Sequence, residues 1–287
     1  MIENNLQVWL NLAKQEASKG KLPSYIPLLA QVNPQTIAIA IQNINGDLVN
    51  GNLVMAGDID ATFPLMSVIK PFLLLYVLEN FGETEVFRMV DAKPSDDPFN
   101  AVPASKPRNP MINNGAIALA SLLTSCEDLQ NWLNQRSGAN LTMDQEMLDS
   151  VRSVTNRRNL TISKQLKTLG IIADHHQALA IYEEICCLRA HVQDLVKIGA
   201  LFVDTGRSPY IPIVLKIMTE CGMYEASAEF AADIGLPSKS SVSGALLSIM
   251  PNQSAIACYS PALDAIGNSV AGLFLMRNIM KIKGEIS

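Results

Sequence analysis

The residues best suited to chemistry in this sequence are a serine and a lysine three residues apart, Ser67 and Lys70, at the start of an apolar run. In a helix this spacing puts the hydroxyl and the amine on one face, about one turn apart. A serine at a helix start also has its own backbone N–H, and the positive end of the helix, directed toward whatever it attacks. The Ser-x-x-Lys arrangement is typical of acyl-transfer enzymes, in which a neutral lysine takes the serine proton. The alternative interpretation is a helix N-cap followed by a solvated lysine.

Two further features favour acyl transfer. Residues 72–78 are apolar or aromatic, which is typical of a helix buried on most sides. Burial would lower the pKa of Lys70 and favour the neutral amine that a general base needs. Far downstream, Lys239-Ser240-Ser241 precedes a predicted strand. A basic residue and a hydroxyl facing the nucleophile across a cleft would raise the positive potential around a developing oxyanion.

Strands at both chain ends, with helices between them, would position these residues. Residues 37–41 alternate between large and small apolar types, and Asn45-Gly46-Asp47 after them is a strong hairpin signal. Residues 245–250 and 255–259 flank a second turn and predict another strand pair. Apolar periodicity predicts helices over residues 4–18, 67–79, 116–125, 129–133, 143–155, 160–169, 178–203, 211–221 and 267–281. The sequence thus predicts an α+β fold: an antiparallel sheet built from both chain ends with flanking helices, plus an all-helical lobe.

Length and composition are those of a globular protein with a sizeable core. The 287 residues are 48% hydrophobic and 17% charged. We expect a single catalytic unit over residues 1–287, with a mixed α/β lobe (about 1–66 and 225–287) and a mainly helical lobe (about 67–224). The net charge of −5, without a stripe of clustered lysine and arginine, argues against nucleic-acid and anionic-membrane partners.

Compartment and cofactor expectations come from absences in the sequence. No apolar run is long and charge-free enough to span a bilayer, and no secretory signal is visible at the start. The five cysteines form no Cys-x-x-Cys pair, and their odd number fits a reduced chain. The three histidines lack a metal-ligand spacing with them. The sequence therefore predicts a cytoplasmic protein with no metal and no other cofactor.

The order of a serine helix followed by a basic strand is also that of serine β-lactamases and penicillin-binding proteins. Longer stretches give a closer resemblance over nearly the whole chain, to the serine-dependent glutaminases, a family within the β-lactamase-like fold. The matching stretches are Tyr25-Ile26-Pro27, Ser67-Val68-Ile69-Lys70, Pro98-Phe99-Asn100, Asn109-Pro110-Met111-Ile112-Asn113, Arg158-Asn159, Cys221-Gly222-Met223-Tyr224, Gly235-Leu236-Pro237, Lys239-Ser240 and Gly267-Asn268-Ser269. The resemblance implies an amidohydrolase that converts L-glutamine to L-glutamate and ammonia without a cofactor. It also implies a homo-oligomer, either a dimer or a tetramer.

The resemblance implies roles for individual residues as well. Ser67 would attack the side-chain amide carbon, Lys70 would be its base, and Tyr224 would take part in proton movement. The backbone N–H groups of Ser67 and Val242 would hold the oxyanion. The other candidates for substrate binding are Tyr25, Asn113, Arg152, Asn159, Tyr182, Lys239 and Ser240. Tyrosines are also common in cores and asparagines in turns, and that remains the alternative for these positions.

In several places the sequence departs from the family pattern. Arg152 stands where the family usually has a glutamate that can bind the α-ammonium group of the substrate, and the reversed charge should repel an ammonium. Met66 replaces the usual glutamine beside the serine. Glycines of the family pattern are replaced by Asp96, Ser241, Ser243 and Ala245. The acyl-transfer residues thus match the family, whereas the substrate-recognition residues are altered.

Three hypotheses follow from these departures. The first is a glutaminase in which another group meets the α-ammonium. The second is an amidohydrolase of a different amide, which lacks a free α-ammonium or carries a carboxylate that Arg152 could pair with. The third is a paralogue that keeps the fold and binds a ligand or partner without catalysis. A site without catalysis has no physical need for Ser67-x-x-Lys70, Tyr224 and Lys239 together, which argues against the third. We favour the first, with the second as the alternative.

Overall fold

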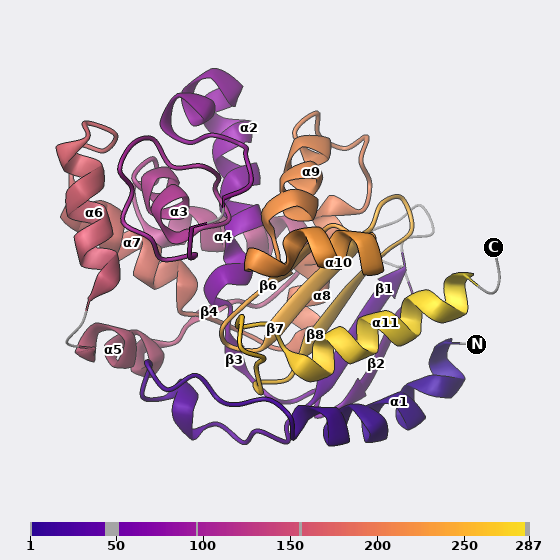
Figure 1. The fold of residues 1–287 in the computed structure, drawn as a ribbon. Helices are drawn as coiled ribbons and strands as arrows, with labels where there is room; N and C mark the ends of the chain where they lie inside the picture. The colour runs from indigo at the N-terminus through magenta and orange to yellow at the C-terminus, as the bar shows by residue number, and fades with distance from the viewer. Residues whose placement is uncertain (1, 44–51, 96, 155–156, 285–287) are drawn as a thin grey trace.

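The structure is a computed structural model that describes residues 2–43, 52–95, 97–154 and 157–284 (Figure 1). The predicted hairpin turn at Asn45-Gly46-Asp47 and the substituted loop residue Asp96 lie outside the described residues. None of the helices in the described ranges is long and apolar enough to cross a bilayer.

A five-stranded antiparallel sheet joins the two ends of the chain, in the order β2-β1-β8-β7-β6. Its strands are β1 (Ala38–Asn43), β2 (Leu53–Gly57), β6 (Ser238–Ser240), β7 (Ala245–Met250) and β8 (Ser254–Tyr259). The two ends meet where β1 pairs with β8, with Ala38 opposite Tyr259 and Ile41 opposite Ile256. The predicted α+β fold, with a sheet built from both chain ends, is therefore confirmed.

The alternating residues of β1 serve two different cores, because successive side chains of a strand point to opposite faces. The helices that cover the sheet are α1 (Ile2–Ala17), α8 (Val192–Gly199) and α11 (Val270–Gly284). Ile39 and Ile41 pack in the core shared with α1 and α11, which lie side by side in Figure 1. Ala38 and Ala40 belong to the larger core on the other face, where α8 contacts β1. Small residues on that face leave room for the helix.

Between the two groups of strands the chain is mainly helical. The helices are α2 (Lys70–Met89), α3 (Asn113–Ala120), α4 (Cys126–Ser137), α5 (Gln145–Ser153), α6 (Arg158–Thr168), α7 (His175–Cys186), α9 (Ile211–Cys221) and α10 (Ser227–Asp233). In Figure 1 most of them gather at the upper left, away from α1 and α11. The division of the chain into two lobes stays a prediction.

The single helix predicted over residues 178–203 is wrong, because a strand interrupts it. β5 (Leu188–Ala190) separates α7 from α8. It is the middle strand of a second, three-stranded sheet, between β3 (Phe63–Pro64) and β4 (Thr142–Met143). Pairing with segments far away in the sequence decides the strand here, and local periodicity does not contain that information.

This second sheet fixes the chain that leads to Ser67. Phe63 pairs with Ala190 across the β3–β5 ladder. The backbone N–H of Leu65 donates to the carbonyl oxygen of Leu188 at 2.9 Å. The segment before the serine is therefore hydrogen-bonded to β5.

Candidate active site

Ser67 lies in a short 3₁₀ turn, Met66–Ile69, that leads into α2. Met66 has a φ of +47°, a left-handed conformation that residues other than glycine adopt rarely. Such a conformation costs about 1–3 kcal/mol and persists only where the surroundings hold it. The residue before it, Leu65, is held by β5 through its N–H, and its carbonyl oxygen accepts from the hydroxyl of Ser241 at 2.9 Å. Ser241, which replaces a family glycine, thus ties the turn after β6 to the turn that carries Ser67.

The amine of Lys70 is buried one turn after Ser67. The residue is 1% exposed, and Nζ donates to Oδ1 of Asn113 at 2.7 Å and to the carbonyl oxygen of Met111 at 3.2 Å. Burial lowers the pKa of Lys70 to about 8. A neutral amine that makes these two donations keeps a lone pair that can accept a proton. The structure thus gives Lys70 the buried environment that the apolar run predicted.

The side chain of Asn113, at the start of α3, connects Lys70 with two other candidates. Its Oδ1 accepts from Lys70 and from the hydroxyl of Tyr182, the latter at 3.0 Å. Its Nδ2 donates to Oδ1 of Asn159 at 2.9 Å. Side chains from α2, α3, α6 and α7 are therefore joined in one hydrogen-bond network.

Tyr224 lies just after the end of α9, in contact with Ser67. A hydrogen bond joins the Ser67 side chain to the Tyr224 hydroxyl, which in turn donates to the carbonyl oxygen of Ser240 at 3.2 Å. Burial raises the pKa of Tyr224, and the hydrogen bond with Ser67 partly opposes this rise. Tyr224 also has a positive φ, +55°, so the site contains two non-glycine residues in the left-handed conformation, Met66 and Tyr224. The phenol is therefore neutral and keeps its hydroxyl proton next to Ser67.

Lys239 lies behind Tyr224 and supports it. Its Nζ is 4.3 Å from the centre of the Tyr224 ring and donates to the carbonyl oxygens of Gly222 and Ser240, at 2.8 and 2.7 Å. A Cβ on Gly222 would come within 1.8 Å of the Ser238 carbonyl oxygen, so only glycine permits β6 to pass this close to the end of α9. Lys239 thus holds β6 and the loop of Tyr224 together.

Ser67 opens into a pocket made of two adjacent hollows, of about 80 Å³ and about 170 Å³. The predicted site residues that line it are Tyr25, Ser67, Asn113, Asn159, Tyr182 and Val242. The predicted site residues that do not line it are Lys70, Arg152, Tyr224, Lys239 and Ser240. Within the described chain, neither the N–H of Ser67 nor that of Val242 donates a backbone hydrogen bond, so both are available to a ligand oxygen.

Nearly the whole chain resembles proteins of one family. It matches the sequence model of the glutaminase family over residues 20–284. It is 41% identical to the glutaminase of Synechocystis sp., with 94% of this chain and 86% of that protein covered. The chain belongs to the glutaminase family. The glutaminase reaction is the hydrolysis of L-glutamine to L-glutamate, which breaks an amide C–N bond.

Solved glutaminase structures share the fold. A probable glutaminase from Bacillus subtilis, complexed with 6-diazo-5-oxo-L-norleucine, matches with a TM-score of 0.85 at 26% identity, covering 96% of this chain and 92% of that one. The glutamate form of Mglu matches with a TM-score of 0.85 at 29% identity, covering 96% and 67%. The predicted membership of the glutaminase family and its β-lactamase-like fold are confirmed.

Removing the Tyr224 hydroxyl tests its part in the glutaminase reaction. In Tyr224→Phe the ring contacts with Lys239 and Phe99 can remain, whereas the hydrogen bonds to Ser67 and Ser240 are lost. We expect kcat for L-glutamine to fall about 10²-fold with little change in KM, because a proton relay acts on the chemical step. Tyr210→Phe, which changes a tyrosine outside the site, is the control. Unchanged kcat in Tyr224→Phe would show that the hydroxyl is not part of the relay.

Several residues that line the glutaminase pocket were not predicted. They are Ile26, Phe99, Val151, Glu183 and Cys186. Cys186 lies one helical turn after Tyr182 and hydrogen-bonds its side chain, and burial raises the pKa of this thiol to about 11. The spacing to Tyr182 was a signal that could have found Cys186. Glu183 gave no such signal, because adjacent glutamates in a helix usually face solvent.

Arg152 contacts other protein side chains rather than the pocket. Its Nε donates to Oε2 of Glu183 at 3.2 Å and its Nη2 to Oε1 of Glu184 at 3.1 Å. The reversed charge on α5 is therefore compensated by two carboxylates on α7. This pairing removes the reason for expecting Arg152 to bind a substrate carboxylate, which motivated the second hypothesis.

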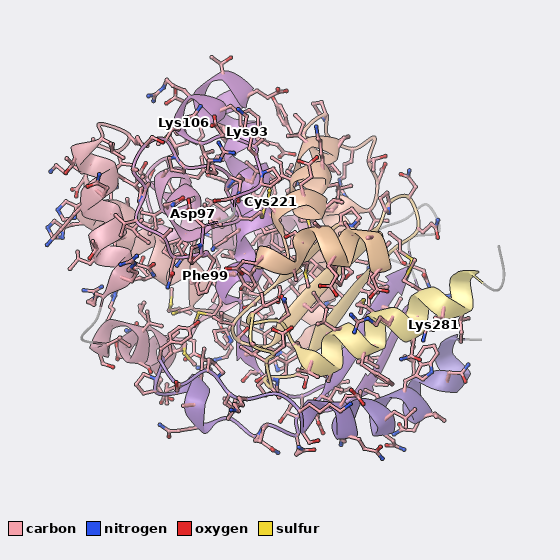
Figure 2. The ribbon with its side chains drawn as sticks, viewed as in Figure 1. Lys93, Asp97, Phe99, Lys106, Cys221 and Lys281 are labelled. Carbon is pink, nitrogen blue, oxygen red and sulfur yellow. The ribbon has the colours of Figure 1, made fainter. Side chains whose placement is uncertain are left out.

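A second cavity, of about 460 Å³, borders Phe99 and Tyr224, whose ring centres are 5.3 Å apart. The loop before α3 and the end of α9 line it, and Figure 2 labels Asp97, Phe99 and Cys221 on this face. Phe99 thus lines both this cavity and the pocket of Ser67.

Proposed function

We propose that this chain carries out the glutaminase reaction through an acyl-enzyme on Ser67, with Lys70 as the general base. The observation that carries the proposal is the buried amine of Lys70, with a pKa lowered to about 8, one turn from a serine that lines the pocket. An amine with this pKa is partly neutral near physiological pH and can take the serine proton. An exposed lysine would stay protonated and could not do so.

The first half of the reaction forms the acyl-enzyme. Oγ of Ser67 attacks the side-chain amide carbon of L-glutamine while its proton passes to Nζ of Lys70. The N–H groups of Ser67 and Val242 hold the resulting oxyanion. When the C–N bond breaks, the nitrogen takes the proton of the Tyr224 hydroxyl, which is replaced by the proton held on Lys70. Ammonia leaves, and the amine of Lys70 is neutral again. A γ-glutamyl ester remains on Ser67.

The second half releases the acid. A water molecule attacks the ester carbon and gives its proton to Lys70. The C–O bond to Ser67 then breaks, and the serine oxygen takes the proton back from Lys70. L-Glutamate leaves with the oxygen of the water, and the enzyme returns to its starting state.

We assign the binding of the amino-acid part of L-glutamine to Tyr25, Asn113, Asn159 and Tyr182. Their polar groups line the pocket around Ser67, which supports this role. Because Asn113 also bonds Lys70, a ligand at its amide would meet the same network that positions the base. Lys239 and Ser240 are assigned a supporting role behind Tyr224.

The compartment and the assembly of the protein remain part of this proposal. All five cysteines are free and buried, which supports a cytoplasmic protein. A dimer or tetramer, which the resemblance predicts, stays a prediction that light scattering of the purified protein can test.

Ammonia release from L-glutamine by the purified protein tests the function. We expect turnover of L-glutamine, and slower turnover of L-asparagine by about 10- to 200-fold, because the side chain is one methylene shorter. Incubation with 6-diazo-5-oxo-L-norleucine should label Ser67, as peptide mass spectrometry can show. If the protein releases no ammonia and Ser67 is not labelled, the proposed function is contradicted.

A further inference from the structure

The substrate of this reaction carries charges that the pocket must compensate. L-Glutamine has an α-ammonium group as well as an α-carboxylate, and moving an ammonium out of water is costly unless it is paired. The inference below rests on the proposed function, because it concerns how that substrate is held. A side chain of this pocket must therefore offer a negative charge to the ammonium group.

Among the described residues that line the two hollows, Glu183 is the sole carboxylate. It lines both hollows, directly after Tyr182 on α7, and is 5% exposed. The neighbouring polar groups of the pocket are amides, hydroxyls and the arginines at 157 and 158. An ammonium group in this pocket therefore has one place to find an opposite charge.

Two arginines hold the Glu183 carboxylate from outside the smaller hollow. Oε2 accepts from Nε of Arg152 at 3.2 Å, and Oε1 accepts from Nη2 of Arg157 at 2.6 Å. A carboxylate has about four lone-pair positions, so each oxygen keeps capacity for a ligand N–H. The bonds fix the orientation of the group without exhausting its acceptors.

The charges of this cluster balance. Arg152 also pairs with Glu184 at 3.1 Å, so two guanidinium groups face two carboxylates. An arriving ammonium therefore meets a neutral cluster, of which Glu183 alone lines the smaller hollow that contains Ser67. The expected repulsion by Arg152 is removed by this pairing.

We propose that Glu183 binds the α-ammonium group of the substrate, and that Arg152 and Arg157 are positioning residues that orient its carboxylate. The charge that the family usually supplies from α5 would here come from α7. Arg152 on α5 then has a function of its own, because it orients the Glu183 carboxylate.

The test compares substrates with and without the α-amino group. The probe is glutaramate, the same amide with hydrogen in place of the amino group, and kcat/KM is measured for it and for L-glutamine. We expect Glu183→Gln to lower the preference for L-glutamine by about 30-fold or more, mainly through KM, because a buried ion pair is lost. Arg152→Gln should lower it less. An unchanged preference in Glu183→Gln would overturn the proposal.

Glu79→Gln is the matched control. Glu79 of α2 is a half-buried carboxylate that also pairs with an arginine, Arg136, but it lies outside both hollows. We expect this variant to keep the preference of the starting protein within about threefold. An equal loss of preference in both variants would show that the ion pairs matter only for structure, and would also overturn the proposal.

Binding measurements separate this inference from the proposed function. In a Ser67→Ala background, calorimetry with L-glutamate and with glutarate compares ligands that differ in the amino group. Glu183→Gln should weaken L-glutamate at least about tenfold and leave glutarate nearly unchanged. This result would support the role of Glu183 even if the protein releases no ammonia. A lack of ammonia release would count against the proposed function alone. If Glu183→Gln does not fold, Glu183→Asp takes its place, and a loss confined to L-glutamate is again required.

Discussion

Ser67→Ala is expected to lower kcat/KM for L-glutamine by about 10⁴-fold or more, which is the scale of losing the nucleophile of an acyl-transfer enzyme. The Ser67 hydroxyl follows the strained residue Met66, is hydrogen-bonded to Tyr224 and belongs to a residue that lines the pocket together with Val242. Alanine keeps the turn and the pocket but cannot form the acyl-enzyme. Initial rates of ammonia release, at enzyme concentrations high enough to detect residual turnover, check the result.

A matched serine shows whether the loss is specific. Ser163 is a fully buried serine of α6 whose hydroxyl bonds the Leu160 carbonyl oxygen at 3.0 Å, and it does not line the pocket. Ser163→Ala should keep kcat/KM within about threefold, because one internal hydrogen bond contributes only about 1 kcal/mol to stability. If Ser67→Ala retains a tenth of the starting activity or more, Ser67 is not the nucleophile.

Lys70→Met is expected to lower kcat by about 10³-fold, within the usual range for loss of a general base. Methionine has a similar length and suits the buried site, so the substitution removes the amine without leaving a large cavity. The thermal unfolding temperature should not fall sharply, because a buried amine carries a desolvation cost that methionine does not. A variant with kcat near that of the starting protein would rule out Lys70 as the base.

The pH profile gives an independent test of the same assignment. The base must be neutral, and burial lowers the pKa of Lys70 to about 8. The kcat/KM of the starting protein should therefore rise roughly tenfold per pH unit below pH 8 and level off above it. In Lys70→Met the residual activity should lose this rise. A profile that is flat between pH 6 and about 9 would contradict a lysine base with this pKa.

Elements with strong local periodicity were predictable in detail. The predicted boundaries of α9, at residues 211 and 221, and of β7, at residues 245 and 250, agree with the structure to the residue. Apolar spacing and the flanking turns decide these elements, and both can be seen in the sequence. β5 could not be found in this way, because its partners are β3 and β4, far away in the chain.

The candidate site also contains features that could be predicted from the sequence and features that could not. The spacing of Ser67 and Lys70 along one turn is a local property, and the structure keeps it. The contacts of Asn113 with side chains of α2, α6 and α7 are not local, and only family resemblance pointed to this residue. Arg152 was expected at the substrate, whereas the structure places it against Glu183 and Glu184.

The sequence by itself determined the reactive groups and the fold class: a serine and a lysine one turn apart, a later basic strand and a sheet made from both ends. The tertiary structure decided what those groups experience. A pKa depends on desolvation and a charge depends on its partners, and at this site both come from helices brought together by packing. The amine of Lys70 owes its lowered pKa to such burial, and Glu183, which lines the pocket from α7, is paired with two arginines from another part of the chain.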